Sequence, residues 1–182
     1  MKDFTIKPYE STYYDDWNTF VSRAKNSTFL FQRDFMEYHS NRFADFSLMG
    51  LDNKKLVAVV PANRVGNVVF SHQGLTYGGI VVGEEIRLPE MILIVKSVLK
   101  FLHEHQVNTI QIKNIPSIYN RYFSDELTYG MFLSKAKLIR VDCLSVIDLS
   151  KPSKYSALRT RGVRKGAKNK LQIREENNLD GF

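Results

Sequence analysis

Three patterns in this sequence predict an α/β (α+β) fold, in which helices pack on the faces of a mixed, partly antiparallel sheet. Two apolar, β-branched runs at 46–51 and 56–60 are joined by Asp-Asn-Lys-Lys, which is typical of a β-hairpin. Residues 88–105 place apolar side chains at three- and four-residue steps, so they predict a long helix that packs on a sheet. A strand at 109–113 follows this helix closely, which indicates a strand, helix, strand crossover.

The N-terminal part is predicted to contribute a strand and two helices. A short strand at 4–7 precedes a helix at 11–25, which carries the only tryptophan, Trp17, on its apolar face. Residues 26–28 break this helix, and a second helix is expected at 33–42. Trp17 is therefore predicted to be a core residue.

The C-terminal part is predicted to hold short helices, two strands and one basic helix. The ranges are 117–123 and 125–133 for helical pieces, 141–149 for a buried strand, 155–170 for a helix capped by Ser150, and 171–174 for a closing strand. Cys143, the only cysteine, lies in the apolar strand and is predicted to be a core residue.

Length and composition predict one soluble domain. The chain has 182 residues, of which 43% are hydrophobic, enough for one substantial core. The sequence contains no run of about 18 apolar residues, the length needed to span a membrane. The first residues do not resemble a signal peptide, so we expect a cytoplasmic protein. We expect a single domain over 1–176, with 177–182 starting a further element of a longer protein.

The positive charge is concentrated in one segment. Residues 151–176 hold nine lysines and arginines against two acids, which accounts for the whole net charge of +7. On the predicted helix, four cations fall within an arc of about 100°: Arg161, Arg164, Lys165 and Lys168. This face either binds an anionic partner or is simply solvated, and the pattern leaves both interpretations open.

Sequence patterns for catalysis are weak. There is no nucleophile elbow, phosphate-binding Walker loop or dinucleotide fingerprint. His103 and His105 point about 200° apart on a helix, so they predict no shared metal. The catalytic residue is unknown at this level, and no metal is expected.

Glycines interrupt the stretch 70–83, where Gly78 and Gly79 lie between Tyr77 and the apolar run 80–82. Glycine is used where φ is positive or where a ligand or another backbone comes closer than a Cβ allows. The pair therefore predicts either a strained turn or bulge, or one wall of a binding groove.

Three segments together resemble the Fem-type peptidyltransferases and their relatives in the GNAT acyltransferase superfamily. Residues 26–32, Asn-Ser-Thr-Phe-Leu-Phe-Gln, resemble the family's early Ser-Phe-x-Gln segment, and 74–82 is similar to its glycine-containing strand entry. Residues 148–150 with 158–171 resemble the strand, basic helix and strand late in its first GNAT-like half.

The resemblance implies a GNAT-like fold and a function. Members of the family carry two GNAT-like halves and transfer an aminoacyl or acyl group to an amine of a bacterial cell-wall or surface-polysaccharide precursor. This chain would be the first half, completed by a missing second half. The co-substrate would be acyl-CoA or aminoacyl-tRNA, with no tightly bound cofactor.

The resemblance also implies site residues. Gln32, Tyr77, Gly78 and Gly79 would line the acceptor groove. Arg159 or Arg161 would hold a phosphate or carboxylate of an anionic small-molecule or glycan-precursor acceptor. The superfamily's pyrophosphate loop is half met by 159–164, where an arginine takes the place of the final small residue.

Two other interpretations compete with the transferase. The cationic face of Arg161, Arg164, Lys165 and Lys168 could contact the phosphates of a nucleic acid, including a tRNA, in a non-catalytic binding module. The same face could instead dock on the missing half of the polypeptide.

Overall fold

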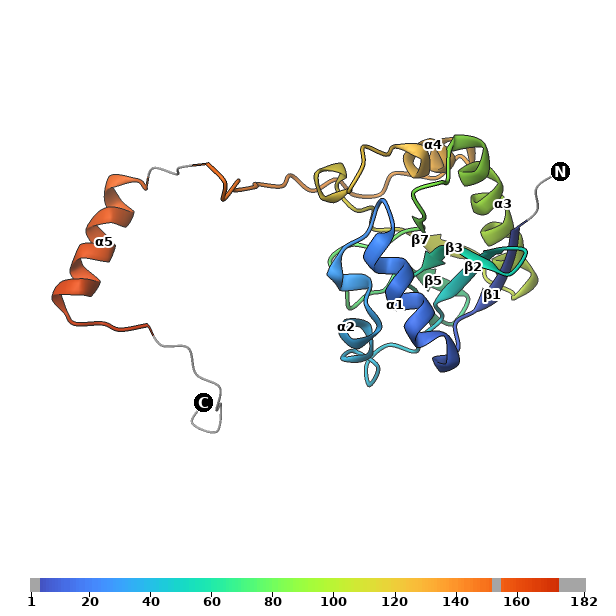
Figure 1. The fold of residues 1–182 in the computed structure, drawn as a ribbon, viewed down its shortest axis with the longest axis horizontal. Coiled ribbons are helices and arrows are strands. Elements are labelled where there is room, and N and C mark those ends of the chain that lie inside the picture. Colours follow the sequence, from blue (N-terminus) through green and yellow to red (C-terminus); the bar gives the residue numbers. More distant parts are fainter. Residues whose placement is uncertain (1–3, 152–154, 174–182) are drawn as a thin grey trace. The chain divides into compact units, whose positions relative to one another are not determined.

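In a computed structural model, the chain divides into two units, residues 1–137 and 138–182. The structure describes residues 4–151 and 155–173. Figure 1 shows the sheets and most helices in the first unit and the basic helix in the second. The predicted single domain over 1–176 depends on how the two units pack and stays a prediction. The predicted further element at 177–182 lies outside the described residues.

The larger sheet is antiparallel throughout, with the strand order β1-β2-β3-β6. Its strands are β1 (Phe4–Pro8), β2 (Leu48–Asp52), β3 (Lys55–Val60) and β6 (Val81–Val82). The predicted hairpin is confirmed as β2 and β3. Asn53 takes a left-handed φ of 55° in its tight turn, a conformation that asparagine tolerates better than most residues.

The smaller sheet is mixed, with the strand order β4-β5-β7. It consists of β4 (Asn63–Val65), β5 (Val68–Phe70) and β7 (Thr109–Gln111). Because β5 pairs parallel with β7, the intervening helix α3 (Leu88–Glu104) forms a crossover. The predicted long helix, the crossover and the mixed fold class are therefore confirmed.

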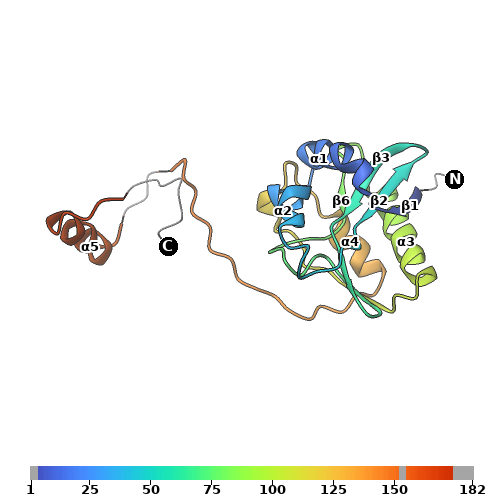
Figure 2. The same ribbon diagram turned by 90° about the horizontal axis from the view of Figure 1, so that it is seen from below.

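Helices cover both faces of the larger sheet (Figure 2). Side chains alternate along a strand, so Leu48 packs in the cluster with α3, whereas its neighbour Met49 packs in the cluster with α1 (Tyr14–Arg23). Trp17 on α1 is fully buried, and its indole nitrogen donates to the Phe31 carbonyl at 2.8 Å. Its predicted core role is confirmed.

The remaining helical elements of the first unit are short. They are α2 (Arg33–Glu37), α4 (Glu126–Leu133) and single 3₁₀ turns at Ser11–Tyr13, Phe29–Phe31 and Ser117–Tyr119. The second predicted helix is shorter than expected, because the hydrogen bonds from His39 N to Met36 O and from Arg42 N to His39 O each span three residues, as in turns.

The second unit contains the predicted basic helix, α5 (Ala157–Lys168). The Ser156 hydroxyl accepts a hydrogen bond from Arg159 N at 3.4 Å, so Ser156 caps the helix in place of the predicted Ser150. Leu171–Ile173 have no regular structure, so the predicted closing strand is wrong for these residues. Its last residue, Arg174, lies outside the described residues.

The predicted buried strand at 141–149 is wrong. This segment has no strand hydrogen bonds, and Val141 and Leu149 are exposed. Cys143 is exposed as well, so its predicted core role is wrong. A strand forms only where a neighbouring strand satisfies its backbone groups, and the described part of this unit contains no other strand.

None of the helices in the two described ranges has the length and apolar character to cross a membrane.

Candidate functional site

A cavity of about 460 Å³ lies in the first unit, where α1 ends and the chain turns into the segment 26–32. Its lining includes Gln32, which the sequence predicts to bind substrate. We call it the Gln32 cavity, and its main polar and aromatic lining residues are Ser22, Thr28, Phe29, Gln32, Tyr119 and Arg121.

Side-chain hydrogen bonds fix the segment that carries Gln32. The amide nitrogen of Asn26 donates to Ile80 O at 2.9 Å, and its amide oxygen accepts from Val82 N at 2.9 Å. The buried Asn26 thus acts like an additional strand partner for β6. The Thr28 hydroxyl then caps the 3₁₀ turn before Gln32 by accepting from Leu30 N at 3.2 Å.

Lys25 joins this segment to the opposite wall of the cavity. Its buried ammonium group lies 2.6 Å from the Glu126 carboxylate and 2.7 Å from Ile86 O. Its carbonyl accepts from Arg121 N at 2.7 Å. Burial would raise the pKa of Glu126, but hydrogen bonds from Lys25 and Ser124 hold it below its ordinary value. The carboxylate therefore stays ionised and keeps its partner.

Arg121 and Gln32 supply hydrogen-bond donors at the cavity. The guanidinium of Arg121 donates to Ser22 O at 2.7 Å, one of the five donors that an arginine carries. The Gln32 amide donates to Asn18 O at 3.4 Å. A guanidinium beside an amide is suited to a carboxylate or phosphate.

Tyr77 reaches the same region through Tyr119. The two rings lie 5.6 Å apart between centroids, and Tyr119 lines the Gln32 cavity. Burial and a hydrogen bond with Tyr119 raise the pKa of Tyr77, so it is a neutral phenol. Of the predicted site residues, Gln32 therefore lines the cavity, whereas Tyr77 contacts the lining residue Tyr119.

The sequence did not identify Tyr119 or Arg121 as site residues. The aromatic content of 117–123 was the signal available for them, and it predicted only a helical piece. Their position depends on the backbone bond to Lys25, which joins segments far apart in the chain.

Close packing explains Gly78, and backbone conformation explains Gly79. A Cβ on Gly78 would lie 2.2 Å from Ser71 O, and Gly78 N donates to Lys113 O at 2.7 Å. Gly79 has a φ of +117°, which side chains rarely adopt. That these glycines also line an acceptor groove stays a prediction.

The same stretch contains a buried histidine. His72 is 3% exposed, has a left-handed φ of 61°, and its ring lies against those of His39 and Phe43. Burial lowers the pKa of His72 to about 4. With this pKa the ring is neutral at physiological pH. Its Nδ1 has no hydrogen-bond partner in the described structure.

The predicted cations lie on α5 in the second unit. Arg159, Arg161, Arg164, Lys165 and Lys168 are on a helix of which no described residue is buried. The predicted role of Arg159 or Arg161 at an acceptor stays a prediction.

The segment 159–164, which half meets the pyrophosphate loop, does not fit that role. Thr160 N already donates to Ser156 O at 3.0 Å, so the amides that follow lie inside the helix and are used in its backbone ladder. An amide cradle needs the free N–H groups of a helix start. Coenzyme A therefore has no such cradle at these residues.

Among the comparisons with known proteins, only the one with solved structures finds matches. No family model matches the chain, and no curated protein matches it. It is similar to TTHA1254 from Thermus thermophilus, with 12% identity and a TM-score of 0.46 over 81% of this chain and 99% of that chain. A mutant of the same protein gives 14% identity and a TM-score of 0.45 over the same shares.

The ribosomal-protein-S18-alanine N-acetyltransferase from Escherichia coli is a third similar structure. It has 17% identity and a TM-score of 0.41 over 59% of this chain and 64% of that chain. Likeness of this extent assigns no substrate to this chain, whose own residues have to indicate one.

Proposed function

We propose that this chain takes part in acyl transfer and that the Gln32 cavity holds an amine-bearing acceptor. The meeting of two sequence-distant segments at one cavity, 26–32 and 119–121, carries this proposal. A third segment contributes Tyr77, whose ring contacts the lining residue Tyr119. Two of the three segments resemble the Fem-type transferases, so the proposed reaction is aminoacyl or acyl transfer to a cell-wall or surface-polysaccharide precursor.

Four of the lining residues have a role in this proposal. Arg121 pairs with a phosphate or carboxylate of the acceptor. Gln32 hydrogen-bonds to it, and Tyr119 and Phe29 pack against its apolar surface. Phe29 is 70% exposed, so it is accessible to a ligand.

The chemistry is attack of the acceptor amine on an activated acyl carbonyl. A C–N bond forms, and the C–S bond of an acyl-CoA or the C–O ester bond of an aminoacyl-tRNA breaks. The proton that the amine loses is balanced by protonation of the leaving group, which departs as free CoA thiol or as the ribose hydroxyl of the tRNA. Such a reaction depends mainly on positioning and on stabilisation of the oxyanion. It needs no covalent nucleophile.

A transfer assay with the full native protein tests this function. Labelled acetyl-CoA and labelled alanyl-tRNA are offered as donors, and UDP-linked amino sugars and peptides as acceptors. We expect a labelled amide product with one donor, and Arg121→Ala should raise KM for the acceptor about tenfold, the loss of one charged hydrogen bond. Lys100→Ala on α3, whose side chain is 75% exposed, is the control.

The absence of product with every donor and acceptor pair would contradict the proposed function. Equal effects of Arg121→Ala and Lys100→Ala would remove the Gln32 cavity from it.

A second candidate function is nucleic-acid binding by α5. It is favoured by the exposure of the face formed by Arg161, Arg164, Lys165 and Lys168. Four phosphate contacts predict a roughly hundredfold loss of tRNA affinity between about 50 and 200 mM salt. Replacing all four with alanine should remove this salt dependence, and affinity that is insensitive to salt would exclude this function.

A further inference from the structure

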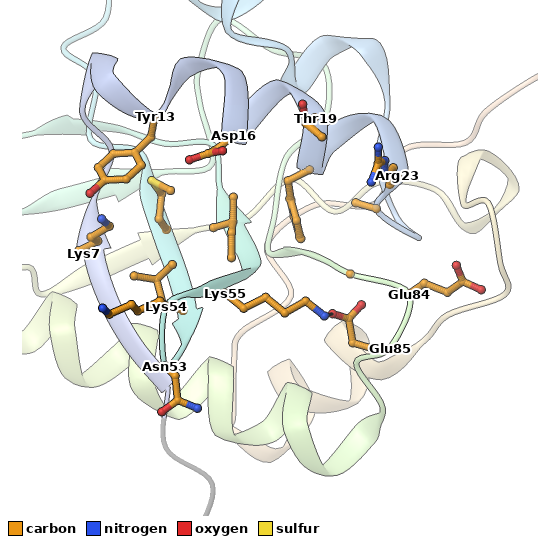
Figure 3. Close-up of a pocket in the computed structure, with 16 residues that line it drawn as sticks. Lys7, Tyr13, Asp16, Thr19, Arg23, Asn53, Lys54, Lys55, Glu84 and Glu85 are labelled. Carbon is orange, nitrogen blue, oxygen red and sulfur yellow. Dashed lines mark hydrogen bonds and ion pairs between the residues drawn. The ribbon is translucent and has the colours of Figure 1, made fainter.

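A larger cavity of about 750 Å³ lies elsewhere on the first unit (Figure 3). It is bounded by β1, α1, the turn between β2 and β3, and the loop Gly83–Glu85. We call it the hairpin groove. It shares only Ala24 with the Gln32 cavity, so the proposed transfer leaves it without a role.

The groove has apolar side chains on its floor and charged side chains at its rim. Phe20 comes from α1, Met49 and Leu51 from β2, and Leu56 from β3. Met49 is buried, whereas Phe20, Leu51 and Leu56 are half-buried. Ten of the sixteen lining residues are polar or charged, so the apolar side chains form a patch inside a polar rim. A volume of several hundred Å³ is typical of small-molecule sites.

The charges differ between the two ends of the groove. Lys7, Lys54 and the Tyr13 ring lie at one end in Figure 3, whereas Glu84 and Glu85 lie at the other. Lys7 Nζ lies 3.5 Å from the centroid of the Tyr13 ring, which holds the ammonium group above the sheet.

At the far end, the Glu85 carboxylate is paired with a cation. Lys55 Nζ lies 2.6 Å from Glu85 Oε1, and Arg23 lies on the same side as Glu84. The Lys7 and Lys54 end presents two ammonium groups, with the Asp16 carboxylate of α1 beside Tyr13, and the apolar lining extends from this end.

We propose that the hairpin groove binds a small amphiphile with an anionic head. A carboxylate or phosphate monoester lies between Lys7 and Lys54, and its aliphatic tail packs on Phe20, Leu51 and Leu56. Lysine acts as a point charge and accepts either head group. Burial of the tail supplies most of the affinity, because each CH₂ removed from water adds to the hydrophobic free energy of binding.

A titration followed by methyl NMR of the full chain tests the proposal. The probes are octanoate, octyl phosphate and octanol at one ionic strength, and the reporters are the methyl groups of Met49, Leu51 and Leu56. We expect octanoate or octyl phosphate to bind about tenfold more tightly than octanol. The tighter of the two identifies the head group.

The variants separate charge recognition from partition of the tail. Lys54→Gln lies in an exposed turn, and the double variant Lys7→Gln/Lys54→Gln removes both ammonium groups. The double variant should bind octanoate and octyl phosphate no better than octanol, whereas Lys100→Gln on α3 should keep the preference. Lys54→Gln alone should reduce it, which keeps the test valid if Lys7 is needed for folding.

Three results would overturn the proposal. They are equal affinity for octanol and both anions, a preference that survives in the double variant, and shifts confined to methyl groups outside the groove. None of them depends on whether acyl transfer is observed.

Discussion

The ammonium group of Lys25 lies 2.6 Å from the carboxylate of Glu126, and both side chains are shielded from water, with 4% and 19% exposed. This pair joins the end of α1 to the start of α4. Because the Lys25 carbonyl also accepts from Arg121 N, the pair holds together the two chain segments that line the Gln32 cavity.

Lys25→Met should lower the free energy of unfolding by about 3 kcal/mol, because it leaves the Glu126 carboxylate buried without its cation. Urea unfolding measures this change. Lys100→Met is the matched control, since Lys100 lies 3.9 Å from Glu104 at an exposed position, and its loss should cost well under about 1 kcal/mol. Similar losses for both variants would show that the Lys25 pair contributes little.

The same pair predicts a loss of stability in acid. The pKa of Glu126 is lower in the folded protein than its ordinary value of 4.5. The stability from Glu126 is therefore fully present above pH 4.5 and is lost as the pH falls through the folded pKa. Glu126→Gln should flatten the unfolding free energy in this window, and an unchanged slope would contradict the assignment.

His72 predicts a second change, at higher pH. Burial favours the neutral ring and lowers its pKa from 6.5 to about 4, so the unfolded chain binds the extra proton first. Stability should fall as the pH decreases from about 6.5 to about 4, the range between the two values. The carboxylate of Asp45 opposes this shift, and His39, Arg33 and Lys113 add to it.

His72→Asn tests this change, because asparagine tolerates the left-handed φ of 61°. In this variant, the unfolding free energy should no longer fall between about pH 6.5 and 4 because of residue 72, whereas the loss of stability due to Glu126 should remain. If the unfolding free energy of the variant still falls over this pH range, another group causes the change.

The elements predicted well from the sequence are those whose local pattern decides their structure. The hairpin turn around Asn53 and the apolar face of 88–105 needed no distant contact to be recognised. The segment 141–149 shows the limit, because its apolar run satisfies a strand pattern and yet a strand exists only beside a partner strand.

The residues of the candidate site were predicted only in part. Gln32 and Tyr77 lie in two of the segments that resemble the Fem-type transferases, and that resemblance implied them as site residues. Arg121 is held at the cavity by the hydrogen bond from its backbone N–H to the Lys25 carbonyl. A periodic sequence pattern does not predict a contact between segments so far apart in the chain.

Gly78 and Gly162 are a matched pair that separates close packing from conformational freedom. A methyl group on Gly78 would meet the Ser71 carbonyl at 2.2 Å, whereas one on Gly162 in α5 would meet nothing within 4 Å. Gly78→Ala should therefore lower the free energy of unfolding by about 3 kcal/mol, as overpacking does, and urea unfolding measures this loss.

Gly162→Ala should instead stabilise α5 by about 1 kcal/mol, the difference in helix propensity, and raise the helical circular-dichroism signal. If Gly78 serves the approach of a ligand rather than packing, Gly78→Ala will leave stability unchanged and weaken acceptor binding alone. That result would restore Gly78 to the acceptor groove that the sequence predicts, and a large loss of stability would assign it to the contact between Ser71 and the chain before β6.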